Sequence, residues 1–173
     1  MQLLTAKKIA VERSTVMALP GVNTVGVKFG YAVETTAGTQ PTAFTQLTRI
    51  NQIGGINIEN EQIDASALED EIEKSIAGRG STGGSFPVTV NATKETITEW
   101  TTLIAAYNTA KADNKQMWFN TYVPSLSKSY MVVAEPPTKL PQPDFDQNSL
   151  LTMELTLTIN DYKGIVDGVE PTA

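Results

Sequence analysis

The sequence predicts a mainly β fold, a sandwich or barrel of about seven strands with one flanking α-helix. Three observations predict this class. Several short segments alternate apolar and polar residues, which is the period of a half-buried strand. One longer segment instead places apolar side chains at helical spacing. The chain has 173 residues, of which 40% are hydrophobic, enough to bury one core without disulfide bonds.

Most of the expected strands are short and rich in β-branched and aromatic residues, which strands favour. In chain order they are residues 25–34, 47–53, 56–63, 86–90, 117–123 and 130–134. The segments 47–53 and 56–63 are expected to pair with each other around Gly54 and Gly55, because glycine clusters typically mark turns.

The strongest strand pattern lies over residues 151–160. Five apolar side chains alternate there with polar ones: Leu151, Met153, Leu155, Leu157 and Ile159. Each contributes about 1.5–3 kcal/mol when fully buried, so this strand should anchor the core.

One helix is predicted after Thr93, whose hydroxyl can cap its first turn, with Lys111 and Lys115 near its end. Its apolar stripe consists of Ile97, Trp100, Leu103, Ile104 and Tyr107. A second helix is predicted from the capping-box pattern Ser66-x-x-Glu69. Leu68, Ile72 and Ile76 follow it at helical spacing, and Gly78 ends it.

The chain divides into three parts on this pattern. Residues 1–20 form an extended N-terminal arm, residues 21–165 form the β domain, and residues 166–173 form a C-terminal tail. The region of about 35–85 within the domain reads as a long loop or hairpin that fits poorly into a compact core. Long segments of this kind are usually functional, disordered, or reach a neighbouring molecule.

Composition excludes several kinds of chemistry. There is no cysteine and no histidine, so disulfides, thiolate zinc sites and Ser-His-Asp or Cys-His catalysis are impossible. The net charge of −6 argues against clamping DNA or an anionic membrane, which requires Lys and Arg. No signal peptide or membrane span is expected. The chain is therefore expected to be neither an enzyme nor a cofactor-binding protein.

The glycines Gly78, Gly80 and Gly83 spell G-x-G-x-x-G, the dinucleotide-binding fingerprint. That motif should follow a strand and open a helix, whereas here it follows a predicted helix and precedes a strand. We interpret it as a flexible turn in which glycine supplies positive φ angles.

Two acidic segments could each form a functional site, and each also has a purely structural interpretation. Asp144, Asp146 and Asn148 begin like a calcium loop, but Ser149 stands where glycine is required, which favours a turn. The seven acids between Glu59 and Glu73 could include a catalytic pair; a solvated face is the simpler interpretation.

From about residue 60 the chain resembles a known family. The segments that carry the resemblance are 63–70 (IDASALED), 78–79 (GR), 83–91 (GGSFPVTVN), an acidic helical stretch ending in Trp100, 115–119 (KQMWF), 133–136 (VAEP) and 148–152 (NSLLT). Together they resemble the major tail tube proteins of long-tailed, non-contractile bacteriophages, over roughly residues 60–165.

The resemblance implies a structural virion protein. Six copies would join their sheets edge to edge into a ring, and stacked rings would form the tube through which double-stranded DNA is ejected without specific binding. Residues 1–20 and 35–62 would bridge subunits or rings. The implied partners are further copies, the tape measure protein, the tail terminator and the distal tail or baseplate proteins. The implied location is the virion tail, after synthesis in the host cytoplasm, with no membrane involved.

The resemblance also gives candidate surfaces. Candidates for the tube lumen are Lys28, Glu34, Thr152, Glu154, Thr156 and Thr158. Candidates for contacts between subunits are Leu3, Leu4, Ile9, Val11, Val16, Ile53, Ile56 and Ile58. Six copies at −6 each would give a ring a formal charge of −36 (6 × −6), which favours a lumen that repels DNA. An alternative is another β-rich assembly subunit, either pilus-like or an adhesive module that decorates capsids.

Overall fold

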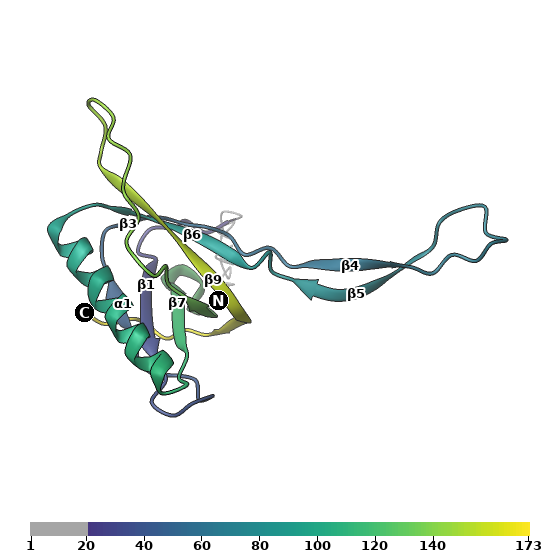
Figure 1. Cartoon of the computed structure of the whole chain (residues 1–173), viewed down its shortest axis with the longest axis horizontal. Coiled ribbons are helices and arrows are strands. Elements are labelled where there is room, and N and C mark those ends of the chain that lie inside the picture. The colour runs from purple at the N-terminus through teal and green to yellow at the C-terminus, as the bar shows by residue number, and fades with distance from the viewer. Residues whose placement is uncertain (1–20) are drawn as a thin grey trace, which may run out of the picture.

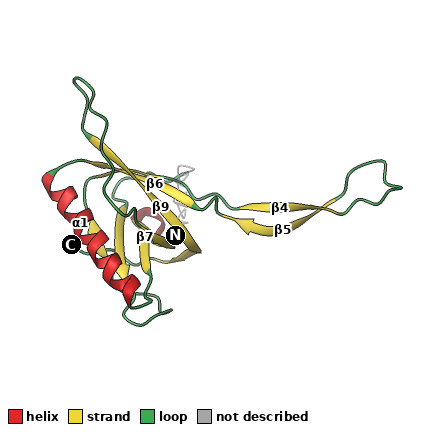
Figure 2. Ribbon diagram, viewed as in Figure 1, coloured by secondary structure: helices red, strands yellow, loops and turns green. Residues whose placement is uncertain are grey.

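The computed structural model describes residues 21–173 as a β-barrel-like body with one helix and one long projecting ribbon (Figures 1 and 2). The elements are β1 (Lys28–Val33), β2 (Thr45–Leu47), β3 (Ile50–Ile53), β4 (Glu59–Asp64), β5 (Ser75–Ser81), β6 (Ser85–Asn91), α1 (Lys94–Ala112), β7 (Met117–Val123), a 3-10 turn (Pro124–Leu126), β8 (Lys128–Glu135) and β9 (Thr152–Asp167). The predicted mainly β class with one flanking helix is confirmed. No helix among these residues is long and apolar enough to cross a membrane.

Seven strands form one antiparallel sheet in the order β2-β1-β7-β8-β9-β6-β3. Its two edge strands, β2 and β3, are separated in the chain by only Thr48 and Arg49. The sheet must therefore curl until its edges approach each other, as in an open barrel. Glu99 of α1 fixes this link, because its carboxylate accepts hydrogen bonds from the Thr48 amide (3.0 Å) and hydroxyl (2.8 Å).

The main core fills the concave side of this sheet. Strand β6 contributes Phe86, Val88 and Val90, and they pair across from the alternating apolar residues of β9. Met153, Leu155, Leu157 and Ile159 are buried as predicted, whereas Leu151 precedes the strand and is 37% exposed. Strand β9 also continues seven residues past the predicted end, pairing with β8 as far as Asp167.

Helix α1 packs against this core through Trp100, Leu103, Ile104 and Tyr107. Thr93 caps the helix as predicted, by accepting a hydrogen bond from the Thr96 amide. The prediction for Ile97 is wrong, because that side chain is 45% exposed. Thr96 takes the buried position in the first turn, where its hydroxyl donates to the Asn91 carbonyl at the end of β6 (2.7 Å).

A second, smaller core lies on the other face of β7 and β8. It consists of Phe44, Trp118, Met131 and Val133, with Val166 and Val169 packed against it. Strands β7 and β8 are thus apolar on both faces over part of their length, which explains the consecutive hydrophobic residues at 117–119 and 130–134.

The second predicted helix does not form, and the predicted pairing around Gly54 and Gly55 is also wrong. Residues 59–64 pair with residues 75–81 instead, and β3 pairs with β6. The side chains expected to cap a helix close a loop: the Ser66 hydroxyl accepts from the Lys74 amide (2.8 Å), and Asp70 accepts from the Ala67 amide (2.8 Å). Serine and aspartate compete with helices in this way.

Candidate assembly surfaces

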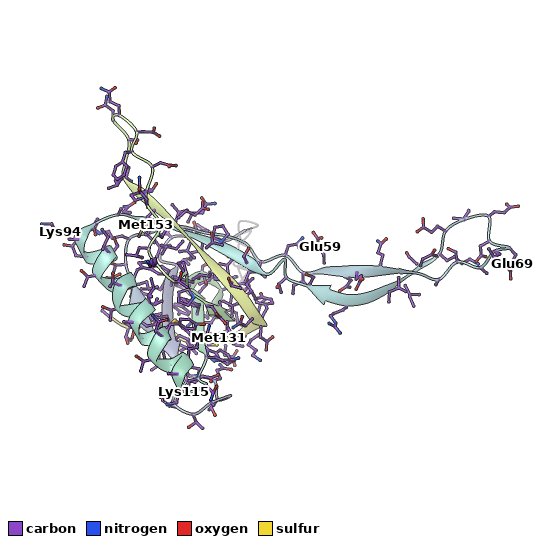
Figure 3. The ribbon with its side chains drawn as sticks, in the orientation of Figure 1. Glu59, Glu69, Lys94, Lys115, Met131 and Met153 are labelled. Atoms are coloured by element: carbon purple, nitrogen blue, oxygen red, sulfur yellow. The ribbon has the colours of Figure 1, made fainter. Side chains whose placement is uncertain are left out.

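Strands β4 and β5 form a two-stranded ribbon that extends the β3–β6 edge of the barrel into solvent. The chain leaves β3, runs out along β4, turns at residues 65–74 and returns along β5 into β6. Figure 3 shows Glu59 near the root of the ribbon and Glu69 at its far end. An isolated two-stranded ribbon is marginally stable at best in water, which makes this one a candidate for contact with another surface.

One face of the ribbon is apolar. Ile63 and Ile76 are direct cross-strand partners and are 48% and 59% exposed. Gly78 lies two residues beyond Ile76 on the same face, and a Cβ there would come within 3.1 Å of the Ile63 side chain. The glycine therefore lets Ile63 lie across the ribbon. Nothing in the subunit covers this face among the described residues.

The ribbon tip presents two further apolar side chains. Leu68 is 107% exposed and Ile72 is 79% exposed. With Ile58 (55% exposed), Ile63 and Ile76 they make up what we call the ribbon face. Exposed aliphatic side chains gathered on one element are typical of interaction sites, so the ribbon face is a candidate contact surface.

The ribbon also carries most of the negative charge. Residues 56–84 hold seven carboxylates and two basic side chains, a net charge of −5 (2 − 7) out of −6 for the whole chain. Lys74 pairs with Asp70 within the tip, and this ion pair lowers the pKa of Asp70. The negative charge is thus concentrated on one projecting element, away from the barrel wall.

Two strand edges of the body are open in the described residues. The outer side of β3 faces no other strand. Strand β9 is covered on one side by β6 only as far as Thr158, after which the Ile159 amide bonds to the Gly84 carbonyl (2.8 Å). Residues 160–167 therefore have one side without a strand partner. Such edges are templates for pairing with another chain.

Four of the six lumen candidates lie together. Thr152, Glu154, Thr156 and Thr158 follow one another on the outer face of β9, and the last three are exposed. The paired residues of β6 continue the same face with Asn91, Thr89, Pro87 and Ser85. The result is a surface of mainly small polar groups with one charge. Lys28 lies apart on β1 and pairs with Glu170 (2.6 Å). That the β9 face lines a lumen stays a prediction.

Glu34 is wrong as a lumen candidate, because its side chain is only 2% exposed. Its carboxylate accepts hydrogen bonds from Trp118 Nε1 (2.9 Å), the Gly38 amide (2.9 Å) and the Gln116 amide (3.1 Å). Burial acts to raise the pKa of Glu34, but these three donors and the positive charge of Lys163 outweigh it, so the pKa lies below its ordinary value. Glu34 holds the loop after β1 against the start of β7.

The substitution Glu34→Gln is expected to lower the free energy of unfolding by about 1–3 kcal/mol at neutral pH, because a buried N–H donor loses its carboxylate. Because the pKa of Glu34 is lower in the folded state than the unfolded value of about 4.3, the ionised carboxylate stabilises the fold above that pH. This contribution to the free energy of unfolding is lost as the pH falls through the folded-state pKa. The variant should therefore lose less stability than the parent on acidification. Denaturant titrations at several pH values measure this; the exposed Glu154→Gln is the control. Identical pH dependence of Glu34→Gln and parent would contradict the assignment.

The candidates for contacts between subunits fall into two groups. Leu3, Leu4, Ile9, Val11 and Val16 lie outside the described residues. Ile53 and Ile56 are half-buried against their own core, where they line a cavity of about 670 Å³ between β3 and the strands opposite. Ile58 is exposed on the ribbon, as a contact residue would be.

The G-x-G-x-x-G pattern and the calcium-loop-like pattern at residues 144–148 both belong to strands and turns in the structure. Gly78 and Gly80 lie within β5, whereas Gly83 and Gly84 adopt φ of +75° and +78° at the passage into β6. The interpretation as a flexible turn is therefore right for Gly83 and wrong for Gly78 and Gly80. Asn148 has φ of +61° in the predicted turn before β9. Within residues 21–173 no group of three acidic side chains is placed to hold a metal ion.

Neither a protein-family model nor a curated protein matches the sequence. Among solved structures, the chain is similar to a protein in the cryo-EM structure of the anti-feeding prophage (AFP) baseplate, 6-fold symmetrised. The identity is 15%, the TM-score is 0.47, and the match covers 89% of this chain and 99% of the other. It is also similar to a protein in the tail of an empty GTA particle computed with helical refinement and C6 symmetry. There the identity is 14%, the TM-score is 0.48, and the coverages are 85% and 94%.

Proposed function

We propose that this chain is a structural subunit of a phage-type tail, which self-assembles into stacked rings that form a tube for DNA. The observation that carries the proposal is the ribbon face: large aliphatic side chains on a projecting ribbon that nothing within residues 21–173 of its own subunit covers. In a monomer these aliphatic side chains stay exposed to water. Self-association would bury them in every copy.

Ring closure follows from the two open edges. The β3 edge and the open side of β9 residues 160–167 are different surfaces of one subunit, so pairing one with the other gives a heterologous contact. Such contacts close into a ring when the rotation between copies fits. Pairing the exposed N–H and C=O groups also removes two edges that would otherwise promote aggregation. The ring of six copies comes from the family resemblance.

The ribbon then connects one ring to the next. Its length carries the ribbon tip, where Figure 3 labels Glu69, well beyond the barrel of its own subunit. Burying five aliphatic side chains of the ribbon face, each at about 1.5–3 kcal/mol, would contribute substantially to every stacking contact. The acidic tip favours contact with a positively charged surface on the next ring. It also repels the equally acidic ribbons of other copies.

The polar face of β6 and β9 is the proposed wall of the lumen. Its threonine, serine and asparagine side chains offer no cation to the DNA phosphates, so nothing there would retain DNA during passage. In this proposal the chain has no enzymatic role, and its location is the virion tail. Its partners would be other copies, and tail proteins at the two ends of the tube and inside it.

Negative-stain electron microscopy of the purified chain over a range of concentrations tests this function. Rings and tubes with a regular axial repeat are the expected result. Thin fimbriae of single file would favour the pilus-like alternative, and particles of a single subunit at high concentration would refute self-assembly.

A further inference from the structure

The last residues of the described chain form a strap over the barrel. After β9 ends at Asp167, residues 168–172 turn back across the outer face of β7 and β1 and reach the edge strand β2. There the Thr172 amide donates to the Phe44 carbonyl (3.0 Å), and the Gln46 amide donates to the Thr172 carbonyl (2.8 Å). These bonds make a parallel bridge between Thr172 and Thr45. The strap thus occupies the side of β2 that faces away from β1.

Each residue at the start of the strap is fastened by a separate contact. The Gly168 amide bonds to the Ser127 carbonyl (3.1 Å), and the Val169 amide bonds to the Ser129 hydroxyl (2.9 Å). The Val169 carbonyl accepts from the side-chain amide of Asn120 (2.6 Å), which is fully buried. Backbone groups held by buried polar side chains have no competing water, so these bonds hold the strap in place.

The far end of the strap fits a niche in β1. Pro171 is buried over Gly30, where a Cβ would lie 2.7 Å from the proline ring. Any larger residue at position 30 would push the strap away. Glu170 adds an ion pair with Lys28 of the same strand (2.6 Å). The strap is therefore seated by shape and charge as well as by the two bonds to β2.

The next outward donor of β2 is also covered. The Thr48 amide, beyond the reach of the strap, bonds to the Glu99 carboxylate of α1. Three successive outward groups of this edge, on Phe44, Gln46 and Thr48, are thus satisfied within the subunit. The outer side of β3 and the open side of β9 have no such cover in the described residues. The β2 edge of the sheet is therefore covered within the subunit, whereas the β3 edge is open in the described residues.

We propose that residues 168–172 are a permanent guard on the β2 edge, which prevents this strand from pairing with another copy and confines association to the β3 and β9 edges. Covering an edge is one of the ways in which β proteins avoid edge-to-edge aggregation. A subunit with three open edges could add copies in several geometries, and most of these would not close. With β2 guarded, the remaining edges specify one geometry. The guard does not depend on whether the final assembly is a tube.

Thr172→Pro is the first test, because proline cannot donate to the Phe44 carbonyl. Thr172→Val is the matched control, since this exposed side chain can change while both backbone bonds remain. Both changes are made with Leu68→Ser and Ile72→Ser, which remove ribbon contacts. Hydrogen exchange at Gln46 reports release of the strap, and sedimentation velocity reports size. Loss of Gln46 protection together with species larger than those of the control, in the proline variant alone, is expected. A folded, strap-released variant of the same size as the control would overturn the guard.

The second test locks the strap onto β2 with a disulfide. It does not depend on a variant in which the strap is released. The chain contains no cysteine, so Thr45→Cys with Thr172→Cys introduces a single possible bridge between partners on the edge and the strap. The native ribbon is kept in this protein. Equal assembly of the oxidised and reduced forms is expected, because the guard stays in place throughout. Assembly of the reduced form alone would show that the strap must leave, and would overturn its permanence.

Discussion

Replacing Leu68 and Ile72 with serine is expected to weaken the stacking of rings, so that tubes form only at a higher concentration, and to leave the subunit folded. Both side chains are almost fully exposed, so the fold of one copy gains nothing from them. If each is buried in a neighbour, its loss costs about 1.5–3 kcal/mol per contact. The loss recurs at every subunit of a tube, so the critical concentration for assembly should rise by at least about tenfold, using 1.4 kcal/mol per factor of ten.

Light scattering against concentration measures this effect, with thermal unfolding as the check on folding. The control carries Val25→Ser and Ile97→Ser, which remove two exposed aliphatic side chains away from the ribbon. The control should assemble like the parent. A ribbon variant that assembles at the parental concentration would show that the ribbon face is not a contact.

Leu155→Asp is expected to abolish folding altogether. Leu155 is 0% exposed in the middle of β9 and lies opposite Val88 of β6. Removing the buried leucine costs about 2–5 kcal/mol, and an unpaired carboxylate in the same place costs several more. Together these losses reach the whole stability of a typical domain, about 5–15 kcal/mol.

Circular dichroism during denaturant titration is the measurement for this substitution. Thr156→Asp is the matched control, because it places the same group one residue along on the exposed face of the strand. The control should unfold cooperatively, whereas Leu155→Asp should show no transition. A soluble Leu155→Asp protein that unfolds cooperatively would mean that the opposite face of β9 points into the core.

Strand β9 could be predicted because its pattern is local and repeats every two residues. Strand β6 shows the same alternation, whereas β7 and β8 are marked by consecutive apolar residues and α1 by apolar residues at helical spacing. The mainly β class follows from these elements. The order of strands in the sheet, in contrast, depends on pairings between residues far apart in the chain.

The hairpin expected within residues 35–85 forms, but a helix is predicted where its tip and second strand lie, because the tip carries helix signals that the tertiary structure overrides. Ser66 and Glu69 have capping-box spacing, yet Ser66 bonds to the Lys74 backbone and closes a loop. A usable signal was present further along: Ile76, Gly78 and Gly80 alternate with Ser75, Ala77 and Arg79, which is the period of a strand. Two glycines within seven residues also argue against a helix.

The Glu34 site and the strap could not be found from sequence, for a related physical reason. Alternation places Glu34 on the polar side of β1, but the loop that follows folds over that side, and Trp118 supplies a donor from 84 residues away. Thr172 likewise meets β2 only because the whole barrel brings the two segments together. No local pattern encodes contacts of this kind.

Hydrogen exchange with mass spectrometry, on assembled material against the same chain diluted to a monomer, tests the central claim most directly. The claim is that the ribbon and the open edges are covered by identical copies. Assembly should slow exchange of the amides in β3, β4, β5 and residues 160–167, and leave those of β2 unchanged beneath their strap. Assembled material in which the ribbon and both open edges exchange as fast as in the monomer would contradict it.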